Sequence, residues 1–474
     1  MRRPNIILVT LDTMRADRLG REVRGRALTP NLSELAGRGT TFTRAVAAGV
    51  PTYFSFPVLF RGGHALGAGK RIGLKDGKPT FVEELRAAGY ATAAVVASNP
   101  YLSRYYAYDR GFDRFEDFSA PGGGRSANVS RAERFLGRAA TTRLRRAKAG
   151  WNHLRESFGE GNPSLHAASR GEAVTSAGLD LMKRLEAPFF LWLHFMDLHG
   201  YYYSKPSDRE RVLGADGTGE RLRLRWERFR YLTRWTELIL ASESRPGPMN
   251  VPHTAEDRRL LEGFYDASVA YTDRWLGRLL GEARDRGDTV VVATSDHGEE
   301  FFEHGRVGHA PFSLYDEVVR VPLVVAGPDV PVASVDSWVS HASMPETMLG
   351  IAGVDAGGLL FGRPDGPVLT ESLWGLTTPF PREHLGEFDV VLSAREGRLK
   401  LIRWEGDGRE ELYDLEADPG ERCDLTGDER FADAAARLRR VIGARAREAA
   451  VQDARYVLER RVRAVRYELE HRSS

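Results

Sequence analysis

Short runs of β-branched and small apolar residues alternate with helical patterns over most of this chain. The first run covers 6–11, and a similar run at 289–293 leads into a cluster of polar residues. Uninterrupted apolar runs of this length are typical of strands that are buried on both faces of a parallel sheet. The same pattern predicts strands at 91–97, 188–195 and 321–326.

Amphipathic helices are predicted between these strands. The segment 30–37 begins with Pro30, a residue that the first turn of a helix favours. The segment 81–88 is followed by Gly89, a common residue just past a helix end, and 260–284 predicts a long helix. Strands that alternate with helices predict the α/β class, with a doubly wound, mostly parallel sheet that has helices on both faces.

The pattern changes twice towards the C-terminus. We predict a large α/β domain at 1–365, a small antiparallel subdomain at 366–428, and a helical tail at 429–474. Two polar segments, near 120–160 and 204–256, interrupt the large domain and are predicted to be insertions. The strands predicted for the small subdomain cover 390–393, 399–404 and 411–415.

Two of these segments allow more than one interpretation. The stretch 131–148 is strongly basic, and is either a solvated helix face or a docking surface for an anionic partner or a membrane. The helical tail carries spaced apolar residues, which either pack back on the domain or form a homo-oligomer contact between copies of the chain.

Composition excludes several classes of protein. The chain has 474 residues, of which 42% are hydrophobic and 28% charged, with a net charge of +2. These values are ordinary for a soluble globular protein and give no case for a nucleic-acid partner. No apolar window is long enough for a membrane span, and the N-terminus lacks a signal-peptide pattern, so we expect a cytoplasmic protein. The single cysteine, Cys423, excludes an internal disulfide and a multi-cysteine metal site.

Candidate chemistry lies where two of the predicted strands end. Asp296 and His297 follow the strand at 289–293, and Asp12 follows the strand at 6–11. Ligands of open α/β sheets bind at the carboxyl ends of the strands, where parallel neighbours would bring these side chains together. Carboxylates and imidazoles are ligands of divalent cations. For Asp12 alone, capping of the next helix is the alternative interpretation.

Five segments of the chain carry recognisable motifs, and they follow one another in this order: 11–17 with 29–32, 294–299, 314–317 with 320–323, 411–415, and 418–421. Together they resemble the sulfatases, a branch of the alkaline phosphatase superfamily. The resemblance covers almost the whole chain. It implies an alkaline-phosphatase-like fold, a divalent cation at the site, and an activity on small anionic esters of sulfate or phosphate.

The nucleophile is where this chain departs from the family. Sulfatases convert a Cys or Ser, two residues before a Pro and four before an Arg, to formylglycine. In the matching stretch, 49–62, counting back from Gly62 places Thr52 at that position. A rival register places Ser55 there, with Leu59 in place of the Arg. We favour Thr52, which cannot become formylglycine but resembles the Thr nucleophile of the phosphate-ester branches, whose hydroxyl a cation acidifies.

Further site residues follow from the resemblance. His199 matches the family's substrate-binding His in the middle of the chain, and His309 lies where the family places a Lys or His against the transferred group. Asn99 stands where the sulfatases often carry a Lys, which implies a less cationic substrate pocket. Thr13 stands where sulfatases usually have a second Asp, and His304 is interpreted as a structural loop residue.

The implied cofactor is one divalent ion, Mn²⁺, Mg²⁺ or Ca²⁺, because the ligand set is rich in oxygen. Its ligands would be Asp12, Thr52, Asp296 and His297. An alternative adds a second ion bound by Asp197, His199 and His309. The predicted function is hydrolysis of phosphate mono- or diesters or sulfate esters through Thr52. The alternatives are a formylglycine-type sulfatase that uses Ser55, a phospho-headgroup transferase, and a catalytically inactive binding protein.

Overall fold

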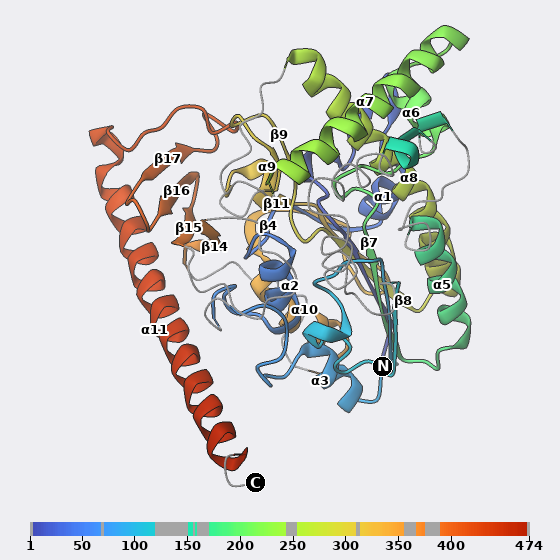
Figure 1. Cartoon of the computed structure of the whole chain (residues 1–474). Helices are drawn as coiled ribbons and strands as arrows, with labels where there is room; N and C mark the ends of the chain where they lie inside the picture. The colour runs from blue at the N-terminus through green and yellow to red at the C-terminus, as the bar shows by residue number, and fades with distance from the viewer. Residues whose placement is uncertain are drawn as a thin grey trace.

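A large mixed sheet lies at the centre of the protein (Figure 1). The computed structural model describes residues 3–67, 71–118, 150–154, 157–158, 170–242, 254–309, 313–354, 366–374 and 389–471. Within these ranges the sheet consists of β1 Asn5–Leu11, β4 Gly39–Val46, β5 Ala91–Val96, β6 Arg114–Asp117, β7 Phe189–Phe195, β8 Thr289–Thr294, β11 Arg320–Val321, β12 Leu323–Ala326 and β13 Ala333–Ser340. Their order is β11-β4-β12-β8-β1-β7-β5-β6, and β13 pairs with β4.

The middle of this sheet is parallel, as predicted. Strand β1 pairs in parallel with both β7 and β8, and β5 pairs in parallel with β6 and β7. The strand predicted at 321–326 is divided at Pro322, which has no N–H to donate to a ladder. Its two pieces, β11 and β12, run antiparallel to β4, and β12 also runs antiparallel to β8.

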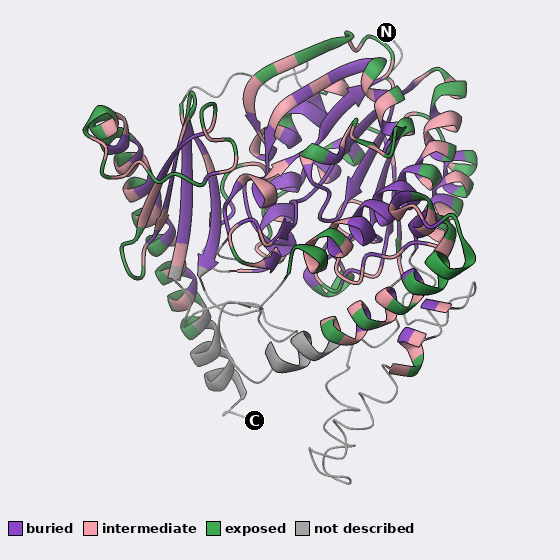
Figure 2. Ribbon diagram, turned by 90° about the horizontal axis from the view of Figure 1, so that it is seen from above, coloured by how far each residue is buried: buried purple, intermediate pink, exposed green. Residues whose placement is uncertain are grey.

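Helices cover both faces of the sheet because successive side chains of a strand point to opposite sides. Ile6 and Leu8 belong to one hydrophobic core, and Ile7 and Val9 belong to the other. The first core includes residues of α2 Thr52–Arg61, α3 Phe81–Ala87 and α10 Met344–Ile351, and the second includes residues of α1 Pro30–Gly37, α5 Gly171–Arg184 and α8 Ala255–Arg286. The central strands β1, β7 and β8 are wholly buried, whereas β13 at the edge is exposed or half-buried along most of its length (Figure 2).

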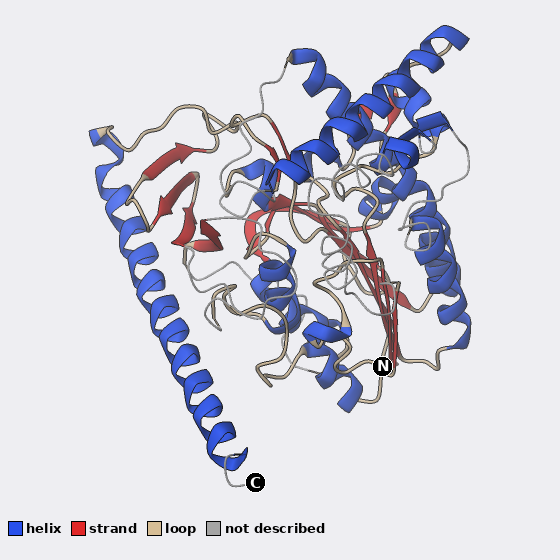
Figure 3. Cartoon of the chain, in the orientation of Figure 1, coloured by secondary structure: helices blue, strands red, loops and turns tan. Residues whose placement is uncertain are grey.

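A second, antiparallel sheet forms the C-terminal part, together with a long helix beside it (Figure 3). Its strands are β14 Val368–Trp374, β15 Asp389–Glu396, β16 Leu399–Trp404 and β17 Glu410–Asp414, and the helix is α11 Ala432–His471. The first half of α11 packs on this sheet through Ala435, Leu438 and Ile442. Further along the helix, Val451 and Leu458 are exposed. The strands predicted here are confirmed, whereas the exact boundaries at 365 and 428 stay predictions.

Some elements had no clear sequence signal. Strand β4 carries three threonines and an arginine among its other residues and is stabilised by pairing with β11, β12 and β13. Helix α2 contains Pro57 in its interior, a residue that normally ends a helix. Burial of nearly all of its residues compensates, because α2 packs against α10 on one side and, through Phe56 and Phe60, against Trp192 of β7.

The remaining elements are short or belong to the second insertion. The insertion forms α6 Pro206–Leu213 and α7 Thr218–Ser242, whereas the basic stretch 131–148 lies outside the described residues. The other short strands and the short helix are β2 Glu22–Val23, β3 Arg26–Ala27, β9 Glu300–Phe301, β10 Val307–Gly308 and α9 Asp316–Val319. In the described part of the chain, no helix is long and apolar enough to cross a membrane.

Candidate active site

Asp12 and Asp296 come together because they follow neighbouring parallel strands. Thr10 of β1 is paired with Thr294 of β8, so each carboxylate lies just beyond the end of its strand. Ligand atoms of Asp12, Asp296 and His297 all lie within 4.8 Å of one another, and all three residues are buried. Among the described residues, no other group of three or more His, Cys, Asp or Glu side chains has this spacing.

The charges of this cluster suit a divalent cation. Burial and the negative charge of Asp12 raise the pKa of Asp296 above its usual value. Burial opposes ionisation of Asp12 too, yet the charges of His199 and His194 hold its pKa well below the usual range. Asp12 Oδ1 is buried and has no hydrogen-bond partner. A buried carboxylate oxygen without a donor is costly, and a cation would satisfy it.

His297 is oriented as a metal ligand needs to be. Its Nδ1 lies 2.9 Å from the carbonyl oxygen of Gly298, so Nδ1 carries the proton. The lone pair of Nε2 is then free to face the carboxylates. Asp296 is held in turn by main-chain donors: its Oδ1 accepts hydrogen bonds from the N–H of Thr13 at 3.2 Å and of His297 at 3.0 Å. Its Oδ2 is left for the site.

Thr52 lies at the N-terminus of α2 with its hydroxyl in this cluster. Thr52 Oγ1 donates to Asp296 Oδ2 at 2.8 Å and lies 3.2 Å from His297 Nε2. Ser55, one helical turn further on, is also buried, but its hydroxyl donates to the main-chain oxygen of Asp296 at 2.7 Å. The Thr52 hydroxyl therefore faces the side-chain atoms that would bind a cation, and the Ser55 hydroxyl faces the backbone behind them.

Asn99 and Thr13 support the cluster from the sides. Asn99 Nδ2 donates to Asp12 Oδ2 at 3.0 Å, so at least one amide hydrogen is used for the carboxylate rather than for a substrate. Thr13 has a positive φ of 62° and its hydroxyl donates to the carbonyl oxygen of Leu198 at 2.9 Å. The hydroxyl of Thr13 is thus turned away from the carboxylates.

His199 and His309 lie at the same edge of the sheet. The ring centroids of His199 and His309 are 4.9 Å apart, and those of His297 and His309 are 4.5 Å apart. Burial lowers the pKa of His199. Burial alone would lower the pKa of His309 as well, but the Glu299 carboxylate outweighs this effect and raises it above the usual histidine value.

Two of the groups near the site were not found from the sequence. His194 of β7 pairs with Thr10 in the sheet, and its Nε2 lies 3.4 Å from Asp12 Oδ2. The indole N–H of Trp192 donates to Thr10 Oγ1, which lies 2.9 Å from His194 Nδ1. Thr10 Oγ1 also lies 3.4 Å from the carbonyl oxygen of Leu193, and His194 Nε2 makes no hydrogen bond within the described ranges, so His194 lies beside Asp12 at ion-pair distance only. The only sequence signal for His194 was its position as a polar residue inside the apolar strand β7.

Glu299 is the second group that the sequence did not reveal. Its carboxylate is buried and lies 3.0 Å from His309 Nδ1 through Oε2, and it accepts the hydroxyl of Tyr202 at 3.0 Å through Oε1. It directly follows the Asp296-His297-Gly298 stretch, but neither its burial nor its partners can be read from that position.

Asp197 and His304 have other surroundings. Asp197 Oδ2 accepts the main-chain N–H of Gly171 at 2.9 Å, at the start of α5, and burial raises its pKa to about 7. Asp197 does not belong to the one metal-type cluster found among the described residues, so the geometry gives no support to a second ion there. His304 stacks on Tyr315 with ring centroids 3.5 Å apart, in keeping with its interpretation as a structural residue.

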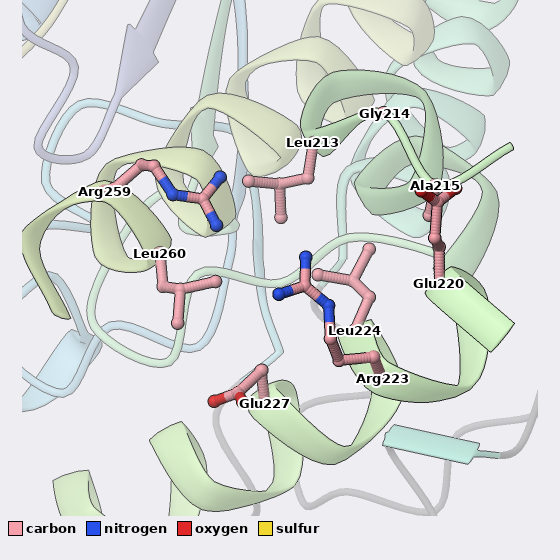
Figure 4. A pocket seen from close by; sticks show the side chains of 9 residues that line it. All are labelled: Leu213, Gly214, Ala215, Glu220, Arg223, Leu224, Glu227, Arg259 and Leu260. Carbon is pink, nitrogen blue, oxygen red and sulfur yellow. The ribbon is translucent and has the colours of Figure 1, made fainter. Parts of the chain in front are cut away.

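A small cavity between α6, α7 and α8 is separate from these residues (Figure 4). Its volume is about 30 Å³, which leaves room for only about two water molecules. Its lining includes Arg223, Glu227 and Arg259 and none of the candidate site residues. The cavity is therefore too small for an organic ester.

Comparisons with known proteins identify the family of the chain. A family model described as Sulfatase matches residues 4–354. The chain is 23% identical over 471 residues to the uncharacterized sulfatase YidJ of Escherichia coli (strain K12), covering 92% of this chain and 86% of that protein. It is 30% identical over 185 residues to the choline-sulfatase of Rhizobium meliloti (strain 1021), an alignment that covers 37% of this chain and 35% of that protein.

Solved structures share the fold over most of the length. A phosphonate monoester hydrolase from Silicibacter pomeroyi superposes with a TM-score of 0.64 at 20% identity, covering 94% of this chain and 96% of that one. A protein solved in complex with its substrate D-glucosamine-2-N,6-O-disulfate superposes with a TM-score of 0.64 at 18% identity, covering 95% and 99%.

The fold and the cluster at its sheet edge define a hydrolase of the alkaline phosphatase superfamily, the class that cleaves sulfate or phosphate esters. Within that superfamily, the chain belongs to the sulfatase family. The family generally uses a divalent metal, and Asp12, Asp296 and His297 are spaced to hold one.

Proposed function

We propose that this protein is a metal-dependent hydrolase that cleaves phosphate mono- or diester bonds, or sulfate ester bonds, with Thr52 as the nucleophile. One observation carries the proposal. Thr52 Oγ1 lies 2.8 Å from Asp296 Oδ2 and 3.2 Å from His297 Nε2, two atoms that a cation would use. A hydroxyl in that position is the natural attacking group for a phosphorus or sulfur centre.

One divalent ion is proposed, bound by Asp12, Asp296 and His297 together with Thr52. When bound, it would acidify the Thr52 hydroxyl and neutralise charge on the ester. The donor set has more oxygen than nitrogen and no sulfur, which favours Mn²⁺, Mg²⁺ or Ca²⁺. Asn99 and His194 hold Asp12 from the side opposite to its free Oδ1, so they fix the ligand without replacing the cation.

The remaining residues divide the work of binding and proton transfer. His309 has a carboxylate partner that raises its pKa, and this favours a protonated ring that gives its proton to the leaving oxygen. Burial lowers the pKa of His199, which favours a neutral ring that donates a hydrogen bond to an oxygen of the transferred group. Any amide hydrogen of Asn99 not used by Asp12 would add a further donor.

Ser55 is a weaker candidate for the nucleophile. Its hydroxyl is donated to the Asp296 main-chain oxygen, and it would have to leave that bond to reach the carboxylates. The formylglycine route is therefore disfavoured, since it starts from this side chain. The similarity to a phosphonate monoester hydrolase and to sulfatases keeps both phosphorus and sulfur esters among the proposed substrates.

A panel of aryl phosphate, phosphodiester, phosphonate and sulfate esters, assayed with Mn²⁺, Mg²⁺ and Ca²⁺, tests this proposal. We expect turnover of at least one phosphorus ester that depends on Thr52 and survives Ser55→Ala. Turnover of sulfate esters alone, lost in Ser55→Ala and kept in Thr52→Ala, would refute it.

A further inference from the structure

A short hairpin brings Glu299 and His309 face to face. Strands β9 and β10 are antiparallel, with Val307 paired to Phe301 and Gly308 paired to Glu300. The next pair in this register is His309 and Glu299, and their side chains meet at 3.0 Å, from Nδ1 to Oε2. The hairpin thus fixes the distance between this carboxylate and this imidazole through the main chain rather than through a flexible side chain.

The Glu299 carboxylate has no part in the cation cluster. It is fully buried, and its second oxygen accepts the Tyr202 hydroxyl at 3.0 Å. Within the described ranges, Glu299 has no Lys or Arg at ion-pair distance, and its charged partner is His309. A buried carboxylate is expensive to keep unless it is paired and hydrogen-bonded. Both of its oxygens are used: Oε2 contacts His309, and Oε1 accepts the hydroxyl of Tyr202, which holds Glu299 in place.

We propose that Glu299 is a positioning residue that, together with Tyr202, orients His309 towards the scissile ester. The inference rests on the proposed function. A carboxylate oxygen 3.0 Å from an imidazole nitrogen is the acceptor of that hydrogen bond, so His309 Nδ1 carries a proton and Nε2 is the only ring nitrogen left for the substrate. The ring lies beside both His297 and His199, so Nε2 belongs to the reacting side of the cluster.

The proton then moves in a balanced cycle. Thr52 Oγ1 gives its proton to solvent and forms a bond to phosphorus or sulfur while the bond from that atom to the leaving oxygen breaks. The electron pair of the broken bond stays on the leaving oxygen, which takes the Nε2 proton, so His309 becomes neutral and keeps its Nδ1 proton in the hydrogen bond to Glu299. Water then adds its hydroxyl to the acid group and gives its other proton to Nε2, and the bond to Oγ1 breaks with its electron pair on Oγ1, which takes a proton from solvent.

Tyr202 connects this pair to the second insertion. Its buried ring lies 6.1 Å from Tyr231 and 6.2 Å from Trp235, both on α7, measured between ring centroids. Trp235 also lies against Gly200, next to His199: a Cβ built on Gly200 would be 3.1 Å from its ring. The insertion helix therefore packs on the residue that holds Glu299, and Tyr202→Phe is expected to loosen His309 without removing its carboxylate.

The test compares Glu299→Gln with Glu300→Gln in the holoenzyme. Glu300 is a matched control: it is buried on the same hairpin, but it accepts from Ser313 and from the His304 main chain. Aryl esters with progressively poorer leaving groups are the readout. We expect Glu299→Gln to lower kcat about 100-fold for the poorest leaving group and less than about tenfold for the 4-nitrophenyl ester, with KM little changed. Glu300→Gln should lower all rates alike.

Two outcomes would overturn the role of Glu299. One is an equal loss of rate across the leaving-group series, as a structural defect would give. The other is additivity of the two substitutions. If the two residues act as a unit, Glu299→Gln should cost almost nothing further in a His309→Gln background, and a full additional loss of rate there would overturn the role.

A measurement without turnover separates this proposal from the proposed function. Nitrogen-15 NMR of histidine in the Mg²⁺-loaded protein, assigned with His309→Gln, should show a proton on His309 Nδ1 in the wild type. That Nδ1 proton should be lost or exchange faster in Glu299→Gln. If the wild type hydrolyses no ester but shows this change, only the proposed function fails. If the His309 signal is the same in both proteins, the role of Glu299 is refuted.

Discussion

Thr52 Oγ1 donates a 2.8 Å hydrogen bond to Asp296 Oδ2, so the first residue of α2 reaches across to the end of β8. This contact joins the proposed nucleophile to the strand end that carries two of the proposed cation ligands, Asp296 and His297. Main-chain bonds to the C-terminal sheet hold the same segment from behind: Val50 N donates to the carbonyl of Glu371, and Glu371 N donates to that of Ala48, both at 3.1 Å.

Thr52→Ala is expected to lower kcat/KM by at least about 10³-fold, because no other hydroxyl faces the carboxylates in the described structure. Thr52→Ser should keep part of the activity, since it keeps the oxygen. Ser55→Ala is the matched control on the same helix. It should cost less than about tenfold in rate but about 1–3 kcal/mol in stability, because the buried Asp296 carbonyl loses its donor. Steady-state kinetics and urea unfolding of the three variants measure both effects.

Removal of the cation is expected to abolish activity and to lower the unfolding temperature. Two buried carboxylates, Asp12 and Asp296, repel each other when no cation lies between them, and burial together with this repulsion raises the pKa of Asp296. A cation at about 100 times its Kd should stabilise the fold by about 2.7 kcal/mol. Thermal unfolding after EDTA treatment, and after addition of Mn²⁺, Mg²⁺ or Ca²⁺, measures this.

Asp296→Asn provides the control for that experiment. It removes one of the two repelling charges, so the metal-free variant should unfold at a higher temperature than the metal-free wild type. It should gain little on addition of a cation, because Oδ2 no longer carries a charge. Equal stabilisation of wild type and variant by a cation would place the ion elsewhere.

Asp197 gives a stability signal that depends on pH. Burial raises its folded pKa to about 7, above the 3.8 of the free side chain. The folded state therefore binds a proton more tightly than the unfolded state, and stability falls as the pH rises from about 4 to about 7, by on the order of 4 kcal/mol. Asp197→Asn should remove this loss, so its unfolding free energy should exceed the wild-type value more at pH 8 than at pH 5. Asp180→Asn, on the exposed side of α5, should show no such dependence.

The sequence predicted the parallel centre of the fold because its signals there are local. Apolar runs such as 6–11 and 289–293 are buried on both faces and need no partner to be recognised. For the same reason, the sequence predicted that Asp12 and Asp296 lie close together, since each directly follows its strand. Strand β4 is different: its threonines fit a strand only because β11, β12 and β13 pair with it.

The part of the site that the sequence did not reveal depends on register and packing. Glu299 contacts His309 only because a hairpin places them opposite each other, and His194 lies beside Asp12 only because it is aligned with Thr10. Nothing within a few residues of either side chain encodes these partners. The contacts that make us propose Thr52 rather than Ser55 also come from the structure, because both hydroxyls are buried on the same helix and differ in what they face.

A buried ionic cluster attaches the C-terminal sheet to the main domain, and it yields the last prediction. Lys400 of β16 is fully buried and lies 2.9 Å from Asp316 and 2.6 Å from Glu421. Lys400→Met removes the only cation at ion-pair distance from Glu421 within the described ranges, so we expect a loss of about 3–5 kcal/mol in unfolding free energy. Arg437→Met, which breaks an exposed pair between α11 and β15, should cost at most about 1 kcal/mol.

The double variant Lys400→Met with Glu421→Gln distinguishes a charge effect from a packing effect. Asp316 keeps Arg395 at 2.8 Å after Lys400 is removed, so Glu421 is the carboxylate left without a cation. Its pKa is already raised to about 7 by burial, which shows how costly its charge is there. Neutralising it should recover part of the loss at pH 8. If urea unfolding shows no recovery, Lys400 stabilises the junction through its packing rather than through its charge.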